Sequence, residues 1–219
     1  MKKSDVEKII IILKEKYPEA TCSLNFKNPF EIVIAVMLSA QCTDERVNKV
    51  TPALFKKYPT PEKMSKAPIN DLEKLIRSCG FYRNKAKHMK ECSIALVDKY
   101  DGIVPSTMDE LQKLPGIGRK SANVIMLEAF HNPQGIAVDT HVKRISNRIG
   151  LSKEKKKKKI EKDLLHKIPT KYYYDANHLG VWHGRYTCIA RKPKCDICPI
   201  SKYCNYYSKE GPSSTVSKD

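Results

Sequence analysis

The sequence predicts an all-α fold, and three observations support that class. Apolar residues recur at helical spacing along most of the 219 residues. Several of these segments begin with a capping residue followed by Pro or Glu, as helix N-termini do. No convincing strand pattern is present.

The first two helices show these signals most clearly. Residues 5–17 carry apolar side chains on one helical face, at Val6, Ile9, Ile10, Leu13 and Tyr17. Asn28, Pro29 and Glu31 form a good helix start, and the residues that follow, 32–38, are apolar on every side. We expect that helix to be a buried central element. It ends at the polar patch Ser39-Ala40-Gln41-Cys42-Thr43-Asp44.

Five further helices are predicted between residues 44 and 130. They cover about 44–57, 70–78, 84–99, 107–114 and 119–130. Asn70 is the expected cap of the second of these. The segment His131-Asn132-Pro133-Gln134-Gly135 is rich in turn residues and is the best candidate for a domain crossing.

Three more helical segments are expected beyond that break. Asp139 and Thr140 form a cap pair, Ser152 is expected to cap the next helix, and residues 171–187 form the last one. The second of these helices opens with the basic run Lys155–Lys159, which is either a solvated face or a direct contact to DNA. The tail from about residue 208 is expected to be disordered.

The charge balance favours a polyanionic partner. The chain has 41 Lys and Arg against 24 Asp and Glu, a net charge of +17. Nucleic acid and an anionic membrane surface both fit such an excess. No apolar run approaches the roughly 20 residues of a spanning helix, and the N-terminus lacks the pattern of a signal peptide. Nucleic acid is therefore the preferred partner, in a cytoplasmic setting.

Residues 114–125 predict a helix–hairpin–helix. Pro115, Gly116 and Gly118 force a tight turn around Ile117, and an apolar helix begins near Arg119. Glycines there leave backbone N–H groups uncovered at the positive end of a helix, which suits a phosphate. The alternative is an ordinary helical hairpin in which the glycines serve packing.

The cysteines divide into two groups. Cys22, Cys42, Cys79 and Cys92 are scattered and are expected to behave as small buried apolar residues. Cys188, Cys195, Cys198 and Cys204 are separated by six, two and five residues. That clustering indicates a thiolate-bound metal in a reducing compartment, and both zinc and an iron–sulfur cluster accept four cysteines.

A bound metal at these cysteines would have a structural role. It would cross-link a C-terminal segment that lacks a hydrophobic core of its own. Three basic residues, Arg191, Lys192 and Lys194, lie between the first two cysteines. We therefore expect a structural staple that also presents a DNA-contacting loop.

Lys120 and Asp139 are the candidate reactive pair. Lys120 follows the hairpin directly, where a lysine is either a phosphate contact or a nucleophile toward a sugar carbon. A lysine amine is almost entirely protonated at neutral pH, and a helix N-terminus favours the neutral form only weakly. Activation therefore requires desolvation or a base such as Asp139. Asp139 is equally explained as a helix cap.

These motifs together resemble the endonuclease III family. The resemblance rests on Leu114–Ile125, Val138–Val142, Ser39–Asp44 and the 6-2-5 cysteine spacing, and it runs from about residue 5 to 206. It implies a bifunctional DNA glycosylase and apurinic/apyrimidinic lyase, probing duplex DNA for damaged pyrimidines and acting as a monomer on the nucleoid of a prokaryote. The runner-up is the adenine-removing mismatch glycosylase of the same superfamily, which commonly lacks a lysine at the position of Lys120. A non-catalytic DNA-binding module is the third reading.

The resemblance also implies a fold and roles for residues. It implies a six-helix domain over residues 22–133 and an iron–sulfur domain of residues 1–21 plus 134–219. It makes Lys120 the Schiff-base nucleophile, Asp139 the catalytic aspartate, and the four clustered cysteines the ligands of a [4Fe–4S] cluster. Gln41 and Phe81 match positions that enter the duplex, although an aliphatic residue is common at the latter. His141 and Arg144 are secondary candidates for phosphate contact.

Overall fold

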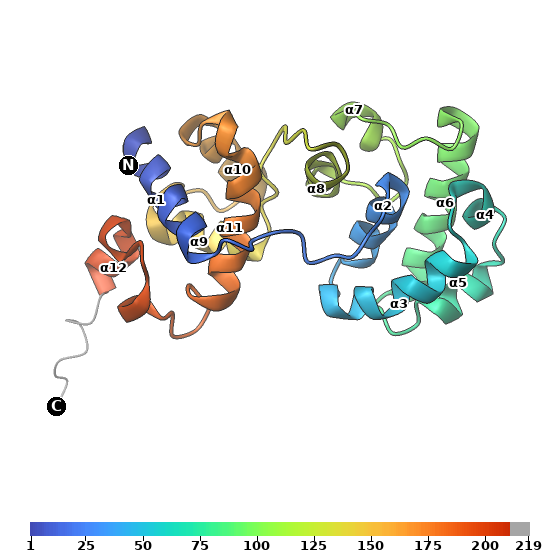
Figure 1. Cartoon of the computed structure of the whole chain (residues 1–219), viewed down its shortest axis with the longest axis horizontal. Coiled ribbons are helices and arrows are strands. Elements are labelled where there is room, and N and C mark those ends of the chain that lie inside the picture. The colour runs from blue at the N-terminus through green and yellow to red at the C-terminus, as the bar shows by residue number, and fades with distance from the viewer. Residues whose placement is uncertain (211–219) are drawn as a thin grey trace. The chain divides into compact units, whose positions relative to one another are not determined.

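A computed structural model describes residues 1–210, and it is all-helical over that range, as predicted. The chain divides into two compact units, Cys22–Gln134 and the pair Met1–Thr21 with the chain from Gly135 onward. None of the helices within residues 1–210 is long and apolar enough to cross a membrane. Figure 1 shows the course of the chain.

The unit Cys22–Gln134 is built around α2. It contains α2 (Pro29–Leu38), α3 (Asp44–Lys57), α4 (Pro61–Ser65), α5 (Ile69–Leu75), α6 (Tyr82–Tyr100), α7 (Met108–Leu111) and α8 (Arg119–Phe130). Every residue of α2 from Phe30 to Leu38 is buried, and α2 packs against α3, α6 and α8. The expectation of a buried central helix is confirmed.

The start of α2 shows why this segment is helical. The Asn28 side chain accepts a hydrogen bond from Glu31 N at 2.9 Å, and Pro29 occupies the first helical position. Pro is compatible with that position because the first N–H of a helix has no intrahelical acceptor. The cap predicted from the sequence is confirmed.

Helix bounds in this unit differ from the sequence-based expectation, most clearly at α5 and α4. Asn70 lies inside α5, which begins one residue earlier after Pro68, because Pro68 fixes an extended conformation just before the helix. The short helix α4 was not predicted. Its start is marked by Thr60, whose hydroxyl accepts from Lys63 N, and by Pro61 at the first position.

The other unit joins the N-terminal helix to the C-terminal half of the chain. It contains α1 (Lys3–Lys16), α9 (Thr140–Ile149), α10 (Lys157–Lys167), α11 (Tyr173–Tyr186) and α12 (Asn205–Glu210), with 3-10 turns η1 (Thr170–Tyr172), η2 (Cys195–Ile197) and η3 (Ser201–Tyr203). The predicted apolar face of α1 is buried. α1 packs against α11 (Figure 1). Lys14 forms an ion pair with Asp175 at 3.0 Å.

The predicted disordered tail is corrected in part. Residues 208–210 belong to α12 and are helical. The rest of the predicted tail, 211–219, lies outside the described residues.

Candidate functional site

The hairpin turn before α8 is fixed by close packing around Gly116. Ile117 N donates to Leu114 O at 3.1 Å, and the Ile117 side chain is buried. Gly116 has φ +79°, and a Cβ there would lie 2.7 Å from Met37 Cε and 3.0 Å from His88 Cβ. Both the left-handed backbone and the tight surroundings therefore require glycine at this position.

Gly118 differs from Gly116 in both respects. Its φ is −94°, and no described atom lies within 4 Å of a Cβ built on it. It is the N-cap residue of α8, and no side chain caps that helix. Neither the backbone conformation nor the neighbouring atoms require a glycine at this position. The missing side chain leaves room for a ligand to come close to the backbone. The first N–H groups of a helix have no intrahelical acceptor, which makes this end of α8 a candidate anion site.

Lys120 is the second residue of α8 and is exposed. Its backbone lies two residues after Gly118, within the first turn of the helix that begins at the candidate phosphate site. The lysine and the hairpin both belong to the unit Cys22–Gln134, and the reactive role of Lys120 stays a prediction.

Asp139 is the N-cap of α9 in the other unit. Its Oδ1 accepts a hydrogen bond from Val142 N at 2.8 Å, and the residue is half-buried. The cap interpretation is thus confirmed. A cap bond through one oxygen fixes the plane of the carboxylate and leaves the second oxygen able to accept a proton or a hydrogen bond.

Two exposed residues with left-handed backbones stand on neighbouring loops. Gln41 has φ 53° after α2, and Phe81 has φ 56° before α6. The two loops touch, because a Cβ on Gly80 would lie 3.6 Å from Gln41 O. Phe81 is 64% exposed. A bulky residue in this strained conformation, with its ring in solvent, is typical of a functional position.

The four clustered cysteines line one pocket. Cys188, Cys195, Cys198 and Cys204 share it with buried Ile149 and Ile200, and none of the four forms a disulfide. Lys194 N donates to Thr187 O at 3.0 Å, which closes the loop between the first two cysteines. Among the described residues, no three His, Cys, Asp or Glu side chains converge on a single metal ion. A polynuclear cluster holds its four thiolates farther apart than one ion does.

The chemistry of these thiols fits a cationic cluster. Burial raises the pKa of Cys198 to about 11, and the charges of Cys188, Cys204 and Cys195 add to the effect. Burial and its thiol neighbours also raise the pKa of Cys195. Thiolates that repel one another in a buried site become favourable ligands once iron supplies positive charge.

Two arginines of α9 hold the cysteine loop. Arg144 donates to Cys188 O at 3.0 Å and to Gly184 O at 2.8 Å, and it lies 3.2 Å from His141 Nδ1. Arg148 donates to Cys188 Sγ at 3.4 Å and to Ile189 O at 2.7 Å. Much of the Arg144 guanidinium is therefore engaged within the protein.

Arg148 and His183 were missed as site residues by the sequence analysis. Arg148 follows Arg144 by four residues on α9, a spacing that places both on one helical face. His183 lies 3.8 Å from Cys198 Sγ through Nε2 and 3.2 Å from the Tyr17 hydroxyl through Nδ1. Burial, with a contribution from Arg144, lowers the pKa of His183 to about 4. His183 lies five residues before Cys188 in the sequence, and this proximity could have marked it as a neighbour of the cysteine site.

The three basic residues of the cysteine loop are exposed to solvent, and their contact with DNA stays a prediction. Arg191, Lys192 and Lys194 are exposed, and Lys192 has a left-handed backbone with φ 51°. These basic side chains belong to the same loop that Arg144 and Arg148 hold through hydrogen bonds.

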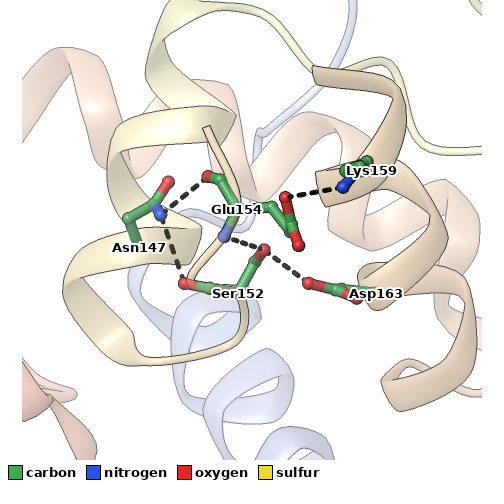
Figure 2. Close-up of polar contacts among 5 residues, drawn as sticks. All are labelled: Asn147, Ser152, Glu154, Lys159 and Asp163. Atoms are coloured by element: carbon green, nitrogen blue, oxygen red, sulfur yellow. Dashed lines mark hydrogen bonds and ion pairs between the residues drawn. The ribbon is translucent and has the colours of Figure 1, made fainter. Parts of the chain in front are cut away.

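Figure 2 shows how the segment before α10 is fixed. Ser152 Oγ donates to Asp163 Oδ2 at 2.6 Å and accepts from Glu154 N at 3.1 Å. Asn147 Nδ2 donates to the carbonyls of Ser152 and Glu154. Ser152 therefore ties a loop to α10 and does not cap that helix, which corrects the prediction.

The basic run Lys155–Lys159 is exposed throughout. Lys159 lies 3.7 Å from Glu154 as an ion pair. α10 begins at Lys157, so Lys155 and Lys156 precede the helix and the last three lysines of the run form its first turn. The run is thus a solvated face, and its contact with DNA stays a hypothesis.

Comparison with protein families identifies the fold. A family model described as HhH-GPD superfamily base excision DNA repair protein matches residues 34–170. The chain is 46% identical over 203 residues to endonuclease III of Synechocystis sp., which covers 93% of each protein. It is 42% identical to endonuclease III of Escherichia coli K12, covering 95% of this chain and 99% of that protein.

The chain belongs to the endonuclease III family. An endonuclease III solved as a trapped covalent intermediate with DNA, in an estranged-adenine complex, superposes with a TM-score of 0.90 at 44% identity, covering 95% of this chain and 98% of that one. A non-covalent endonuclease III–DNA complex gives a TM-score of 0.89 at the same identity and coverage. A thermostable thymine-DNA glycosylase, 24% identical with a TM-score of 0.86, shares the fold.

A second family model accounts for the cysteines. The iron–sulfur binding domain of endonuclease III matches residues 188–204, the segment that begins at the first clustered cysteine and ends at the last. The prediction of an iron–sulfur cluster is confirmed.

Proposed function

We propose that the chain removes damaged pyrimidines from duplex DNA and cleaves the strand at the resulting abasic site, with Lys120 as the nucleophile. One observation carries the proposal. Lys120 is exposed in the first turn of α8, directly behind the uncapped hairpin, in a chain 44% identical to an endonuclease III trapped as a covalent intermediate with DNA.

The proposed chemistry begins with the neutral Lys120 amine. It attacks C1′ of the damaged nucleoside, the base departs with a proton, and the sugar ring opens to an imine. Loss of a C2′ proton then breaks the bond to the 3′ phosphate, which cuts the strand 3′ of the lesion. Water hydrolyses the imine and returns the free amine.

Asp139 is the proposed acceptor of the lysine proton. Its Oδ1 caps α9, so the carboxylate is held in one orientation while the other oxygen acts as base or electrostatic stabiliser. The cap role and the catalytic role are compatible in one side chain.

The DNA-contact roles follow the exposed features of each unit. Gly116, Ile117 and Gly118 form the hairpin that grips a phosphate. Gln41 fills the space left by an extruded nucleotide, and Phe81 wedges the opposite strand. The remaining proposed phosphate contacts are Arg191, Lys192, Lys194 and, with their internal partners, His141 and Arg144.

Cys188, Cys195, Cys198 and Cys204 are the proposed cluster ligands. The bound cluster supplies covalent cross-links that fold the loop between them. Arg148 would donate to the sulfur of Cys188 and orient it. We further propose that the protein acts as a monomer on nucleoid DNA in the cytoplasm.

Borohydride trapping on a duplex with one abasic site tests the nucleophile. The wild-type chain is expected to give a covalent protein–DNA adduct, since hydride reduces the imine to a stable amine. Lys120→Ala should lower the adduct yield by roughly 10³-fold or more. Lys113→Ala, which removes an exposed lysine on the other side of the turn, is the matched control and should trap like wild type.

The same experiment separates the rival functions. A non-catalytic DNA-binding module gives no adduct and no incision. A monofunctional glycosylase releases the base but leaves the strand intact. An unchanged adduct in Lys120→Ala would contradict the assignment of the nucleophile.

Asp139→Asn tests the aspartate with little effect on the fold. Asn caps helices as well as Asp does, so the melting temperature should hardly change. Turnover should fall by about 10²–10⁴-fold, because an amide cannot take the proton. A large drop in melting temperature with turnover preserved would leave Asp139 with the cap role alone.

A further inference from the structure

Two cysteines outside the iron–sulfur loop, Cys42 and Cys79, belong to the loops that carry Gln41 and Phe81. Cys79 is completely buried, and its N–H donates to Ile76 O at 2.8 Å. Cys42 is partly exposed, and its N–H donates to Ser39 O at 3.2 Å. The neighbouring residues bring the two backbones into contact, since a Cβ on Gly80 would lie 3.6 Å from Gln41 O.

The thiols themselves interact. Burial raises the pKa of Cys79 to about 11, with further contributions from the charge of Cys42 and a hydrogen bond to its thiol. Lys85 and Arg46 oppose the shift. Cys92, by contrast, is a buried thiol whose pKa is raised to about 12 by burial alone.

Two basic residues, Lys85 and Arg46, lie near this pair of cysteines. Lys85 is buried, and its Nζ donates to Leu38 O at 2.8 Å, at the end of α2. Its charge, with that of Arg46, partly offsets the effect of burial on the Cys79 thiol. The partly exposed Cys42 is the thiol that an external reagent reaches first.

We propose that Cys42 and Cys79 form a reversible disulfide that ties the Gln41 loop to the Phe81 loop. The bond is formed by exchange with a low-molecular-weight disulfide. Its consequence for activity rests on the proposed function, in which both loops enter the duplex.

The exchange balances in two steps. The Cys42 thiolate attacks one sulfur of the reagent, a mixed disulfide forms, and one reagent thiolate leaves. The Cys79 thiolate attacks the Cys42 sulfur, the protein disulfide forms, and the second reagent thiolate leaves. The two protein thiol protons end on the two reagent thiols, and the reagent disulfide is reduced by two electrons.

The cross-link would restrain insertion into DNA. Gln41 and Phe81 hold left-handed conformations on loops that carry few buried side chains, so they can adjust as a nucleotide leaves the stack. A covalent tie two residues from Phe81 and one from Gln41 limits that adjustment. Misplacement by about 1 Å costs an enzyme up to 10²-fold in rate.

Oxidation with glutathione disulfide, followed by thiol alkylation and trypsin, tests the bond. The expected product joins the peptide 28–46, which holds Cys42, to the peptide 78–83, which holds Cys79, with the loss of two hydrogen masses. Cys42→Ala and Cys79→Ala should each abolish that product. Cys92→Ala, the matched control, should form it like wild type.

Incision by the oxidised chain tests the consequence. The rate on an abasic duplex should fall roughly 10- to 100-fold and recover with dithiothreitol, while the cluster absorbance stays constant. Cys42→Ala should show no change on oxidation. The absence of the linked peptide, or an oxidised chain as active as the reduced one, would overturn the proposal.

The two proposals fail separately. The linked peptide is read by mass and needs no catalytic activity. A fully reduced chain that fails to trap on abasic DNA would refute the proposed function while leaving the cross-link measurable.

Discussion

The hairpin turn at residues 115–118 and the cysteine loop at residues 188–204 both hold short stretches of irregular chain in place, but different forces fix them. At the hairpin, Gly116 fits between Met37 and His88, and Ile117 is buried beneath the turn. In the cysteine loop, Ile200 is the one buried residue. Packing of apolar side chains therefore explains the first and not the second.

Polar groups and thiols replace a core in the cysteine loop. Arg144 and Arg148 donate to three of its carbonyl groups, those of Cys188, Ile189 and Ala190. Its four cysteines line one pocket. A segment with so little apolar burial depends on cross-links for its structure. The two regions thus differ in what must be removed to unfold them.

Loss of one cluster ligand should have the largest effect, and it should fall on one region only. In Cys198→Ala, we expect loss of iron and of the visible iron–sulfur absorption, and rapid proteolysis within residues 188–204. The hairpin should keep its fold because the core around α2 is separate. Absorbance, iron content and the sites of limited proteolysis measure these outcomes.

Cys92→Ala is the control for that experiment, because Cys92 is buried in α6 outside the loop. It should retain iron and resist proteolysis in the cysteine loop. A Cys198→Ala chain with full iron content would show that the loop does not depend on this ligand.

The sequence predicts well whatever is decided by local pattern. The caps at Asn28 and Asp139 form as expected, and α8 begins at Arg119 as the hairpin glycines indicate. Ser152 fails as a predicted cap because α10 begins only at Lys157, and its hydroxyl instead donates to Asp163, eleven residues away. Local spacing does not report a competing partner from another turn of the chain.

The cysteine ligands are predictable from spacing, but their surroundings are not. Arg148 and His183 reach Cys188 and Cys198 only after α9 and α11 have packed together. Cys42 and Cys79 were expected to be isolated apolar residues, and the fold places them in contact. Long-range packing creates these contacts, and single-sequence periodicity carries no information on it.

Gly116→Ala should destabilise the unit Cys22–Gln134. The left-handed backbone and the 3.0 Å approach to His88 Cβ both oppose a methyl group. The expected loss is about 2–4 kcal/mol in the free energy of unfolding. Urea denaturation should show a lower midpoint with an unchanged slope. An unchanged midpoint would mean that the turn relaxes without cost.

Gly118→Ala should change the free energy of unfolding least. It compares a glycine that packing does not require with Gly116, which packing does require. Its φ of −94° suits alanine, and no described atom lies within 4 Å of the added Cβ. The free energy of unfolding should therefore move by no more than about 0.5 kcal/mol. Affinity for an abasic duplex should nevertheless fall about 3- to 30-fold, because a methyl group hinders a phosphate from reaching the first N–H groups of α8. The dependence of log Kd on log salt should keep its slope, since no cationic side chain is removed. If Gly118→Ala bound DNA like wild type, the hairpin would be a packing element and not a phosphate site, which is the alternative that its glycines leave open in the sequence.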